Sequence, residues 1–262
     1  RHGGAKFDKG KGGAYSFSGG LHGVGVSVTN ALGKRLEATS YREGSVARLV
    51  FEGGDVVEPL VVRPNNGSAE GDRKTGTSVR VWPDPKYFES AVLPMGELTH
   101  LLRSKAVLMP GVTVTLTVEK TKEVQTWLYK GGLRDYLQQT LNGDPVIPLF
   151  EGEGFADGGH ESFAEGEGAQ WCVAFTEDGQ PVRESYVNLI PTSAGGTHES
   201  GLRDGLFTAV KSFIELHSLA PKGVKLLPED VFARASYVLS AKVLDPQFQG
   251  QIKERLNSRD AV

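Results

Sequence analysis

The chain has 262 residues, long enough for one large domain or two ordinary ones. Hydrophobic residues make up 39% of it, enough for a packed core, and its net charge of -3 excludes a generally basic nucleic-acid coat. The single cysteine, Cys172, excludes an intrachain disulfide and favours a reducing compartment. No apolar run approaches the roughly 18 residues of a membrane span, and no signal sequence opens the chain. These features predict a cytoplasmic globular protein without a membrane partner.

Charge is distributed unevenly along the chain. Residues 1–50 carry eight Lys or Arg against three Asp or Glu, so this segment could hold an anion. Residues 151–167 carry six acidic residues and no basic ones, which predicts a solvated loop. Residues 1–4 contain no initiator Met and enter directly into a glycine-rich stretch, so we expect that an upstream segment is missing.

In the first half, hydrophobic periodicity predicts a helix at Leu21–Leu32, with Gly33 ending it. Four strands are expected next, as an antiparallel meander with turns at residues 43–44 and 53–54. Their ranges are Arg35–Arg42, Val46–Phe51, Val56–Val62 and Thr77–Trp82. The pattern then predicts a helix, a strand and a second helix, at Pro94–Leu108, Val112–Val118 and Leu133–Leu141.

Residues 142–168 are rich in Gly, Pro and Glu and form the predicted domain boundary. Beyond them the sequence predicts two paired strands, a long helix, a short helix and a last strand. Their ranges are Ala169–Thr176, Ser185–Ile190, Thr197–Leu219, Pro228–Arg234 and Ala235–Val243. Thr197 is the expected N-cap of the long helix.

The segment Ser18–Gly25, called the glycine loop below, directly precedes and enters the first predicted helix. A helix N-terminus leaves backbone N–H groups unpaired and carries partial positive charge, so it favours anions. Glycines let the backbone approach phosphate oxygens, and Lys6 could add charge. The loop lacks the spacing of the two commonest phosphate loops. From the residues alone, it is therefore either a phosphate loop or a flexible glycine-rich connection.

The stretch Gly4–Leu32 resembles the lid and phosphate loop of the GHKL ATPases, in the form found in bacterial type IIA DNA topoisomerase B subunits. The match consists of residues 5–7, Tyr15, Ser18–Val28 and residues 30–32. Gly76-Thr77 resembles the segment whose threonine helps to read the adenine, which gives Thr77 an adenine-side role.

Two motifs in the second half strengthen this resemblance. Gly195–His198, a Gly-Gly-Thr-His box, is characteristic of the family's transducer domain, and we assign His198 no catalytic role. Asp245–Lys253 resembles the Gln-Thr-Lys loop that reaches the γ-phosphate of ATP, although Ile252 replaces the usual Thr. A lysine supplies a point charge and a glutamine a neutral hydrogen bond. The resemblance makes Lys253 the catalytic candidate.

Further segments, among them Lys105–Leu108, resemble topoisomerase IV B subunits more than gyrase B subunits. The resemblance implies an α+β fold: a partial GHKL ATPase sandwich at residues 1–141, then an incomplete transducer domain of the ribosomal S5 domain 2-like type at 142–262. It also implies a set of residues that bind the ATP phosphates. They are Lys6, Tyr15, Gly20, Leu21, His22, Gly23, Val24, Gly25, Gln251 and Lys253.

The parent activity implied is ATP-dependent DNA strand passage, which decatenates and relaxes DNA, with ATP and Mg²⁺ as cofactors. The implied partners are DNA, the topoisomerase A subunit and a second B subunit. In the family a general-base Glu and a Mg²⁺-binding Asn lie on a helix before the lid, so we expect this chain by itself to hydrolyse ATP negligibly. The alternatives are a non-enzymatic DNA-binding or assembly module, and another GHKL member such as a mismatch-repair ATPase or chaperone.

Overall fold

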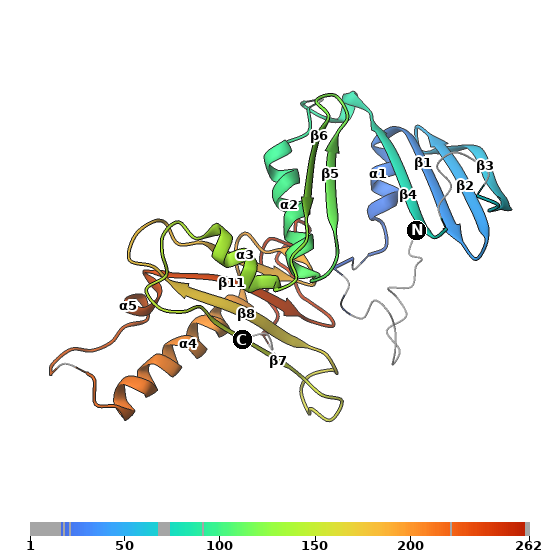
Figure 1. Ribbon diagram of the computed structural model, residues 1–262. Helices are drawn as coiled ribbons and strands as arrows, with labels where there is room; N and C mark the ends of the chain where they lie inside the picture. Colours follow the sequence, from blue (N-terminus) through green and yellow to red (C-terminus); the bar gives the residue numbers. More distant parts are fainter. Residues whose placement is uncertain are drawn as a thin grey trace. The chain divides into compact units, whose positions relative to one another are not determined.

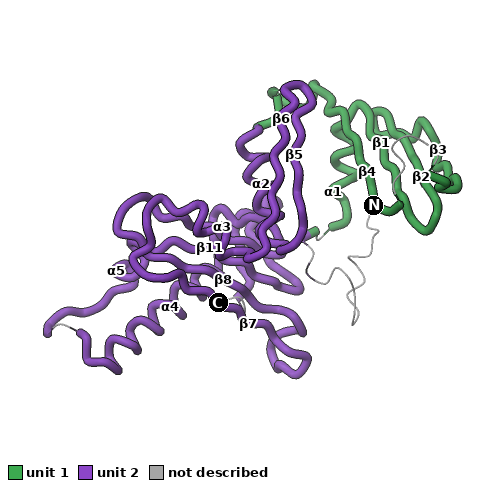
Figure 2. The backbone as a smooth tube through the Cα atoms, in the orientation of Figure 1, with its two compact units in different colours: residues 1–8, 20–94 green, residues 9–19, 95–262 purple. Residues whose placement is uncertain are grey.

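The computed structural model describes residues 17, 19–20, 22–67, 74–90, 92–220 and 222–259. The chain divides into two compact units, coloured separately in Figure 2. Unit 1 comprises residues 1–8 and 20–94, and unit 2 comprises residues 9–19 and 95–262. Both units combine helices with largely antiparallel sheets, so the predicted α+β class is confirmed (Figure 1). Within the described ranges, no helix has the length and apolar character needed to cross a membrane.

Unit 1 contains all four of its predicted strands. Its elements are α1 Gly25–Ala31, β1 Gly33–Arg42, β2 Ser45–Glu52, β3 Asp55–Pro64, β4 Gly76–Pro83 and the 3-10 helix η2 Pro85–Tyr87. The β1–β2 and β2–β3 hairpins turn at residues 43–44 and 53–54, as predicted, and all four turn residues have positive φ. Two-residue hairpin turns favour this left-handed backbone because its twist matches that of the strands.

The strand order in unit 1 is β3-β2-β1-β4, with every neighbouring pair antiparallel. The predicted meander is wrong in its last step, because β4 pairs with β1 instead of β3. Pro59 within β3 has no backbone N–H to donate, which confines that strand to an edge of the sheet. Leu36 on the central strand β1 lies opposite Phe51 on one side and Val81 on the other, and it is buried.

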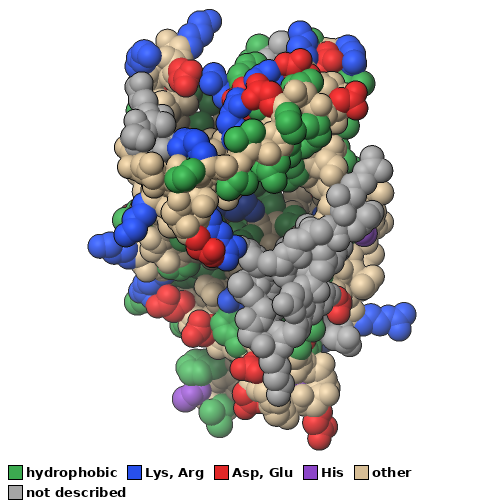
Figure 3. Space-filling view, turned by 90° about the vertical axis from the view of Figure 1, so that its right-hand side faces the viewer, with side chains coloured by type: hydrophobic (Ala, Val, Ile, Leu, Met, Phe, Trp, Pro, Cys, Tyr) green, Lys and Arg blue, Asp and Glu red, His purple; other side chains and the backbone are tan. Residues whose placement is uncertain are grey.

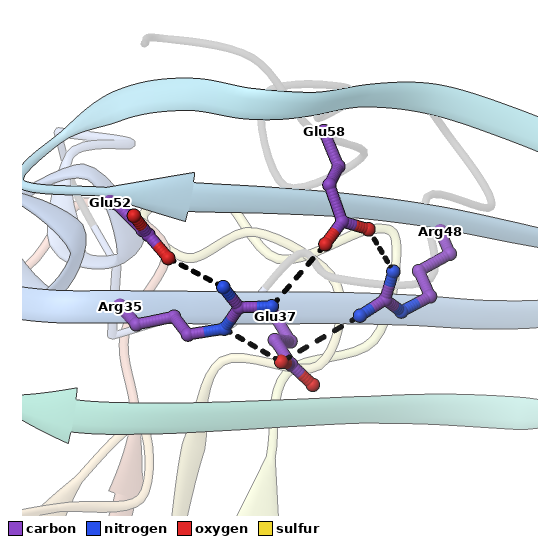
Figure 4. A network of polar contacts seen from close by, with 5 residues as sticks. All are labelled: Arg35, Glu37, Arg48, Glu52 and Glu58. Atoms are coloured by element: carbon purple, nitrogen blue, oxygen red, sulfur yellow. Dashed lines mark hydrogen bonds and ion pairs between the residues drawn. The ribbon is translucent and has the colours of Figure 1, made fainter.

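A network of ion pairs joins three strands of this sheet (Figure 4). Arg35 contacts Glu37 at 2.8 Å, Glu52 at 2.6 Å and Glu58 at 3.4 Å. Arg48 pairs with Glu58 and lies 3.6 Å from Glu37. The side chains are partly exposed, so water screens each pair and its contribution to the stability of the sheet is small. Hydrogen bonding to Arg48 and Arg35 lowers the pKa of Glu58 and so favours its charged form.

Unit 2 contains a five-stranded sheet, a two-stranded hairpin and four α-helices among its described residues. The helices are α2 Met95–Leu108, α3 Gly132–Thr140, α4 Thr197–Leu216 and α5 Pro228–Phe232. The strands are β5 Val114–Val118, β6 Glu123–Trp127, β7 Phe150–Phe155, β8 Gly168–Phe175, β9 Arg183–Val187, β10 Ile190–Pro191 and β11 Ala235–Lys242.

The large sheet of unit 2 has the order β10-β9-β11-β8-β7, and only the β9–β11 pair in it is parallel. Helices α2 and α3 pack against one face, around Cys172 and Val238. Leu202 and Leu206 of α4 pack against the other face. Because both faces are covered, β11 is buried along nearly its whole length. Burial also raises the pKa of the Cys172 thiol to about 11, so it is an inert core side chain.

Several predictions for unit 2 need correction. The acidic segment 151–167 is not simply a loop, because Phe150–Phe155 forms β7 and completes the sheet edge beside β8. Strands β8 and β9 do not pair with each other, since β11 lies between them. The N-cap of α4 is Gly196, so Thr197 is its first helical residue. The predicted domain boundary at residues 141–142 stays a prediction, and the compact units divide at residues 94–95.

Candidate functional site

The predicted γ-phosphate loop is a short hairpin, called the Lys253 hairpin below and spanning residues 247–257. Its backbone closes through Asn257 N to Gln247 O at 2.7 Å and Gln249 N to Arg255 O at 2.9 Å. Leu256 anchors the hairpin in the core of unit 2, beside strands β9 and β11. Lys253 has a positive φ of 61°, which places it at a sharp bend near the tip.

The Gly195–His198 box holds this hairpin through its backbone. Leu256 N donates to Gly195 O at 3.1 Å, and Thr197 N donates to Leu256 O at 3.1 Å. A Cβ added to Gly196 would lie 2.4 Å from Leu256 O, and the φ of Gly196 is 145°. The box therefore needs glycine there for two reasons, the left-handed backbone and the close approach of Leu256.

His198 belongs to a buried row of polar side chains that contact one another in sequence, His198, Thr192 and Ser185. Its Nε2 lies 2.9 Å from Thr192 Oγ1, which in turn lies 2.6 Å from Ser185 Oγ. Burial lowers the pKa of His198 to about 4, so the imidazole is neutral at physiological pH. The contacts give His198 a structural place between β9 and α4, in agreement with the absence of a catalytic assignment from the sequence.

The described structure brings Lys253 to the glycine loop within unit 2. Lys253 Nζ donates to Gly19 O at 2.7 Å, across 234 residues of sequence. Gly19 itself lies against the β9–β10 turn, where an added Cβ would be 2.3 Å from Ile190 Cδ1 and 3.2 Å from Asn188 O. The backbone of Gly19 is thus held between the turn and the lysine.

Two side chains fix the β9–β10 turn, formed by Asn188 and Leu189. Asn188 Nδ2 donates to Val243 O at 2.7 Å, and Asn188 Oδ1 accepts from Val243 N at 2.9 Å. Lys105 of α2 donates from its Nζ to Leu189 O. Partial burial lowers the pKa of Lys105. Sequence analysis assigned no site role to Asn188 or Lys105, because each binds a residue far from it in the chain.

The other predicted site residues have mixed outcomes. Three of them, Lys6, Tyr15 and Leu21, lie outside the described residues. Gly20 directly follows Gly19, and residues 22–25 lead into α1, which begins at Gly25. Thr77 is exposed on β4 opposite Ser40, and Gln251 is exposed near the tip of the Lys253 hairpin. No described contact brings these two to Lys253, and the predicted phosphate and adenine roles stay predictions.

A metal site is not formed by the described residues alone, since no three His, Cys, Asp or Glu side chains within those ranges are placed to hold an ion. The chemistry offered by the described site is that of the Lys253 cation beside a glycine backbone. The lysine suits a phosphate group because it supplies positive charge, whereas the space beside Gly19 is filled by Ile190 and Asn188.

These features define a two-unit α+β protein in which Lys253 contacts Gly19 of the glycine loop, although the two residues lie far apart in the sequence. The sequence profile described as DNA gyrase B matches residues 132–262, half of the chain. The chain belongs to the DNA gyrase B family.

Proteins similar to the chain include B subunits of both topoisomerase IV and gyrase. The chain is 47% identical over its full length to the B subunit of DNA topoisomerase 4 from Salmonella typhimurium, of which it spans 40%. The solved topoisomerase IV ATP-binding domain of Francisella tularensis is 38% identical, with a TM-score of 0.72 over 93% of this chain and 64% of that one. The 43K ATPase domain of Thermus thermophilus gyrase B is 27% identical, with a TM-score of 0.71 over 91% of this chain and 62% of that one. The predicted GHKL-type fold is thereby confirmed.

Proposed function

We propose that this chain is the ATP-binding and transducer region of a type IIA DNA topoisomerase, in which ATP hydrolysis drives one DNA duplex through another. The observation that carries the proposal is the 2.7 Å bond from Lys253 Nζ to Gly19 O. It joins the two motifs that separately resemble the phosphate-binding parts of the family. The solved Francisella tularensis relative is an ATP-binding domain, which supports the choice of nucleotide.

In this proposal Lys253 stabilises the negative charge of the transferred phosphate. Its ammonium is a compact point charge with three N–H groups, one of which donates to Gly19 O. The Gly195–His198 box keeps the lysine in place, since Leu256, three residues after it, is bonded to the box on both sides. A lysine that is already in position before the reaction does not have to move when negative charge develops on the transferred phosphate.

The remaining parts of the proposal come from the family. Bound Mg²⁺ would neutralise charge on the ATP phosphates, and we assign no described residue to it. DNA, the topoisomerase A subunit and a second B subunit are the proposed partners of the whole protein. A cytoplasmic location likewise stays a prediction.

The direct test replaces Lys253 with Gln in the full-length protein and measures Mg²⁺-dependent ATP hydrolysis. Loss of one preorganised charged donor should lower kcat by about 100-fold, as for other transition-state donors. Lys211→Gln is the matched control, because Lys211 is an exposed lysine on α4. Equal kcat values in the two variants would overturn the proposed role of Lys253.

A second candidate function is a DNA-binding or assembly module in which the glycine loop is only a connection. Figure 3 shows acidic and basic side chains mixed with apolar ones on the described surface in view, without a continuous basic field there. Strong binding to DNA backbone needs clustered basic side chains, so the net charge of -3 favours the nucleotide-driven function. Salt-dependent DNA affinity that ignores ATP would support the second candidate.

A further inference from the structure

Lys105 is a half-buried lysine on α2. Its neighbours Ala106 and Val107 belong to the core of unit 2. Burying a charged group is unfavourable unless it gains a partner. Here the Nζ donates to the backbone carbonyl of Leu189.

The carbonyl that Lys105 binds belongs to Leu189, a residue type that is unfavourable in the left-handed backbone of this hairpin turn. Asn188 and Leu189 both have positive φ, 49° and 68°. Asn tolerates this region, but a branched side chain such as Leu rarely adopts it, and a residue held there costs about 1 kcal/mol or more. Among the described residues, the turn is held by the backbone bond from Asn188 N to Ala241 O at 2.9 Å and by the side chains of Asn188 and Lys105.

The same turn is the surface on which Gly19 rests. A Cβ at Gly19 would meet Ile190 Cδ1 at 2.3 Å and Asn188 O at 3.2 Å, so the Ile190 side chain would have to shift. The opposite contact of Gly19 is its carbonyl, which accepts from Lys253. A continuous path thus runs from Lys105 through the turn and Gly19 to Lys253, and all of these residues belong to unit 2.

We propose that Lys105 is a positioning residue for the phosphate site: by binding Leu189 O it fixes the β9–β10 turn, and the turn fixes Gly19 against Lys253. This inference rests on the proposed function of Lys253. Lys105 does not contact the phosphate itself. A displacement of about 1 Å at a reacting group can lower a rate by up to 100-fold, so an indirect effect of this kind is measurable.

The test compares Lys105→Met with Lys105→Arg and Lys211→Met in the full-length protein. Met fills a similar volume without a donor, Arg keeps the charge and donors, and Lys211 is an exposed lysine remote in sequence from the turn. We expect Lys105→Met to lower kcat for ATP hydrolysis about tenfold. It should weaken binding of a non-hydrolysable ATP analogue while leaving ADP affinity unchanged. Lys105→Arg should stay within about threefold of the parent, and Lys211→Met should match the parent.

A double variant separates positioning from general support of the fold. In a Lys253→Gln background, Lys105→Met should change kcat by less than about twofold, because the group that it positions is already gone. A merely structural role predicts the full tenfold loss in both backgrounds and equal weakening of ADP and the ATP analogue. Either of those results would overturn the inference. Should Lys105→Met not fold, Lys105→Gln takes its place with the same expectations.

The two proposals fail in different ways. Unchanged turnover in Lys253→Gln would remove the proposed function, whatever Lys105 does. A large loss in Lys253→Gln, together with a Lys105→Met variant that equals Lys211→Met, would overturn the role of Lys105 alone.

Discussion

The four-stranded sheet of unit 1 and the five-stranded sheet of unit 2 bury their residues to different extents. Within the described residues, the buried apolar side chains of unit 1 are Leu36, Val46 and Val50, and every residue of β3 is exposed. In unit 2, β11 is buried from Ala235 to Ala241 between helices on both faces.

The described residues of unit 1 form tight hairpins over a small buried apolar cluster, and partly exposed ion pairs such as Arg35–Glu52 add little. Unit 2 depends on close packing, in which a small change of volume is strongly felt. We therefore expect substitutions of the same kind to have larger effects in unit 2, and the site of Lys253 depends on the more tightly packed unit.

The largest expected effect compares two glycines with positive φ. Gly196→Ala in unit 2 adds a Cβ that meets the backbone of Leu256 at 2.4 Å, whereas Gly44→Ala in unit 1 meets nothing within 4 Å. Backbone strain and overpacking together should lower the free energy of unfolding by about 4 kcal/mol for Gly196→Ala. Strain alone should lower it by about 1 kcal/mol for Gly44→Ala. Urea unfolding of both variants measures the difference, and equal losses would contradict the comparison.

A smaller effect concerns pH and the buried His198 of unit 2. Its folded pKa of about 4 lies below the ordinary value of 6.5, so the unfolded chain binds a proton that the folded chain does not. The stability contributed by neutral His198 is complete above pH 6.5 and is lost as the pH falls towards 4. Between pH 7 and pH 5 the free energy of unfolding should drop by about 2 kcal/mol.

The control for this pH effect is His198→Gln, which cannot titrate but keeps a polar group near Thr192. Unfolding curves at pH 7, 6 and 5 should show a steeper loss of stability in the parent than in the variant. Parallel pH profiles would show that His198 does not titrate as its burial predicts.

The smallest expected effect lies in the ion network of unit 1. Arg35→Met removes three ion pairs at once, from a side chain that is 30% exposed. Because such pairs are screened by water and salt, the Tm should fall by only about 2 °C at low ionic strength, and by less in 1 M NaCl. Thermal unfolding at both salt concentrations measures it. A loss that does not depend on salt would indicate that packing of the arginine stem matters more than its charge.

Local features of the fold were predictable because they depend on neighbours in sequence. Alternating side chains and the turn residues Glu43-Gly44 and Gly53-Gly54 predicted the first three strands of unit 1 and their hairpins. Strand β7 was not predicted, because its sequence, Phe-Glu-Gly-Glu-Gly-Phe, is rich in glycine and acidic residues, as loops are. It is a strand because β8 offers it a free edge for hydrogen bonding.

The sequence by itself determined the family, the glycine loop and the importance assigned to Lys253, since each depends on a local run of residues. Only the tertiary structure decided that Lys253 meets Gly19, that Gly196 must be glycine beneath Leu256, and that Lys105 supports the β9–β10 turn. These contacts join segments far apart in the chain. The distances between the contacting atoms depend on how the sheet and helices pack, and a local sequence pattern does not specify that packing.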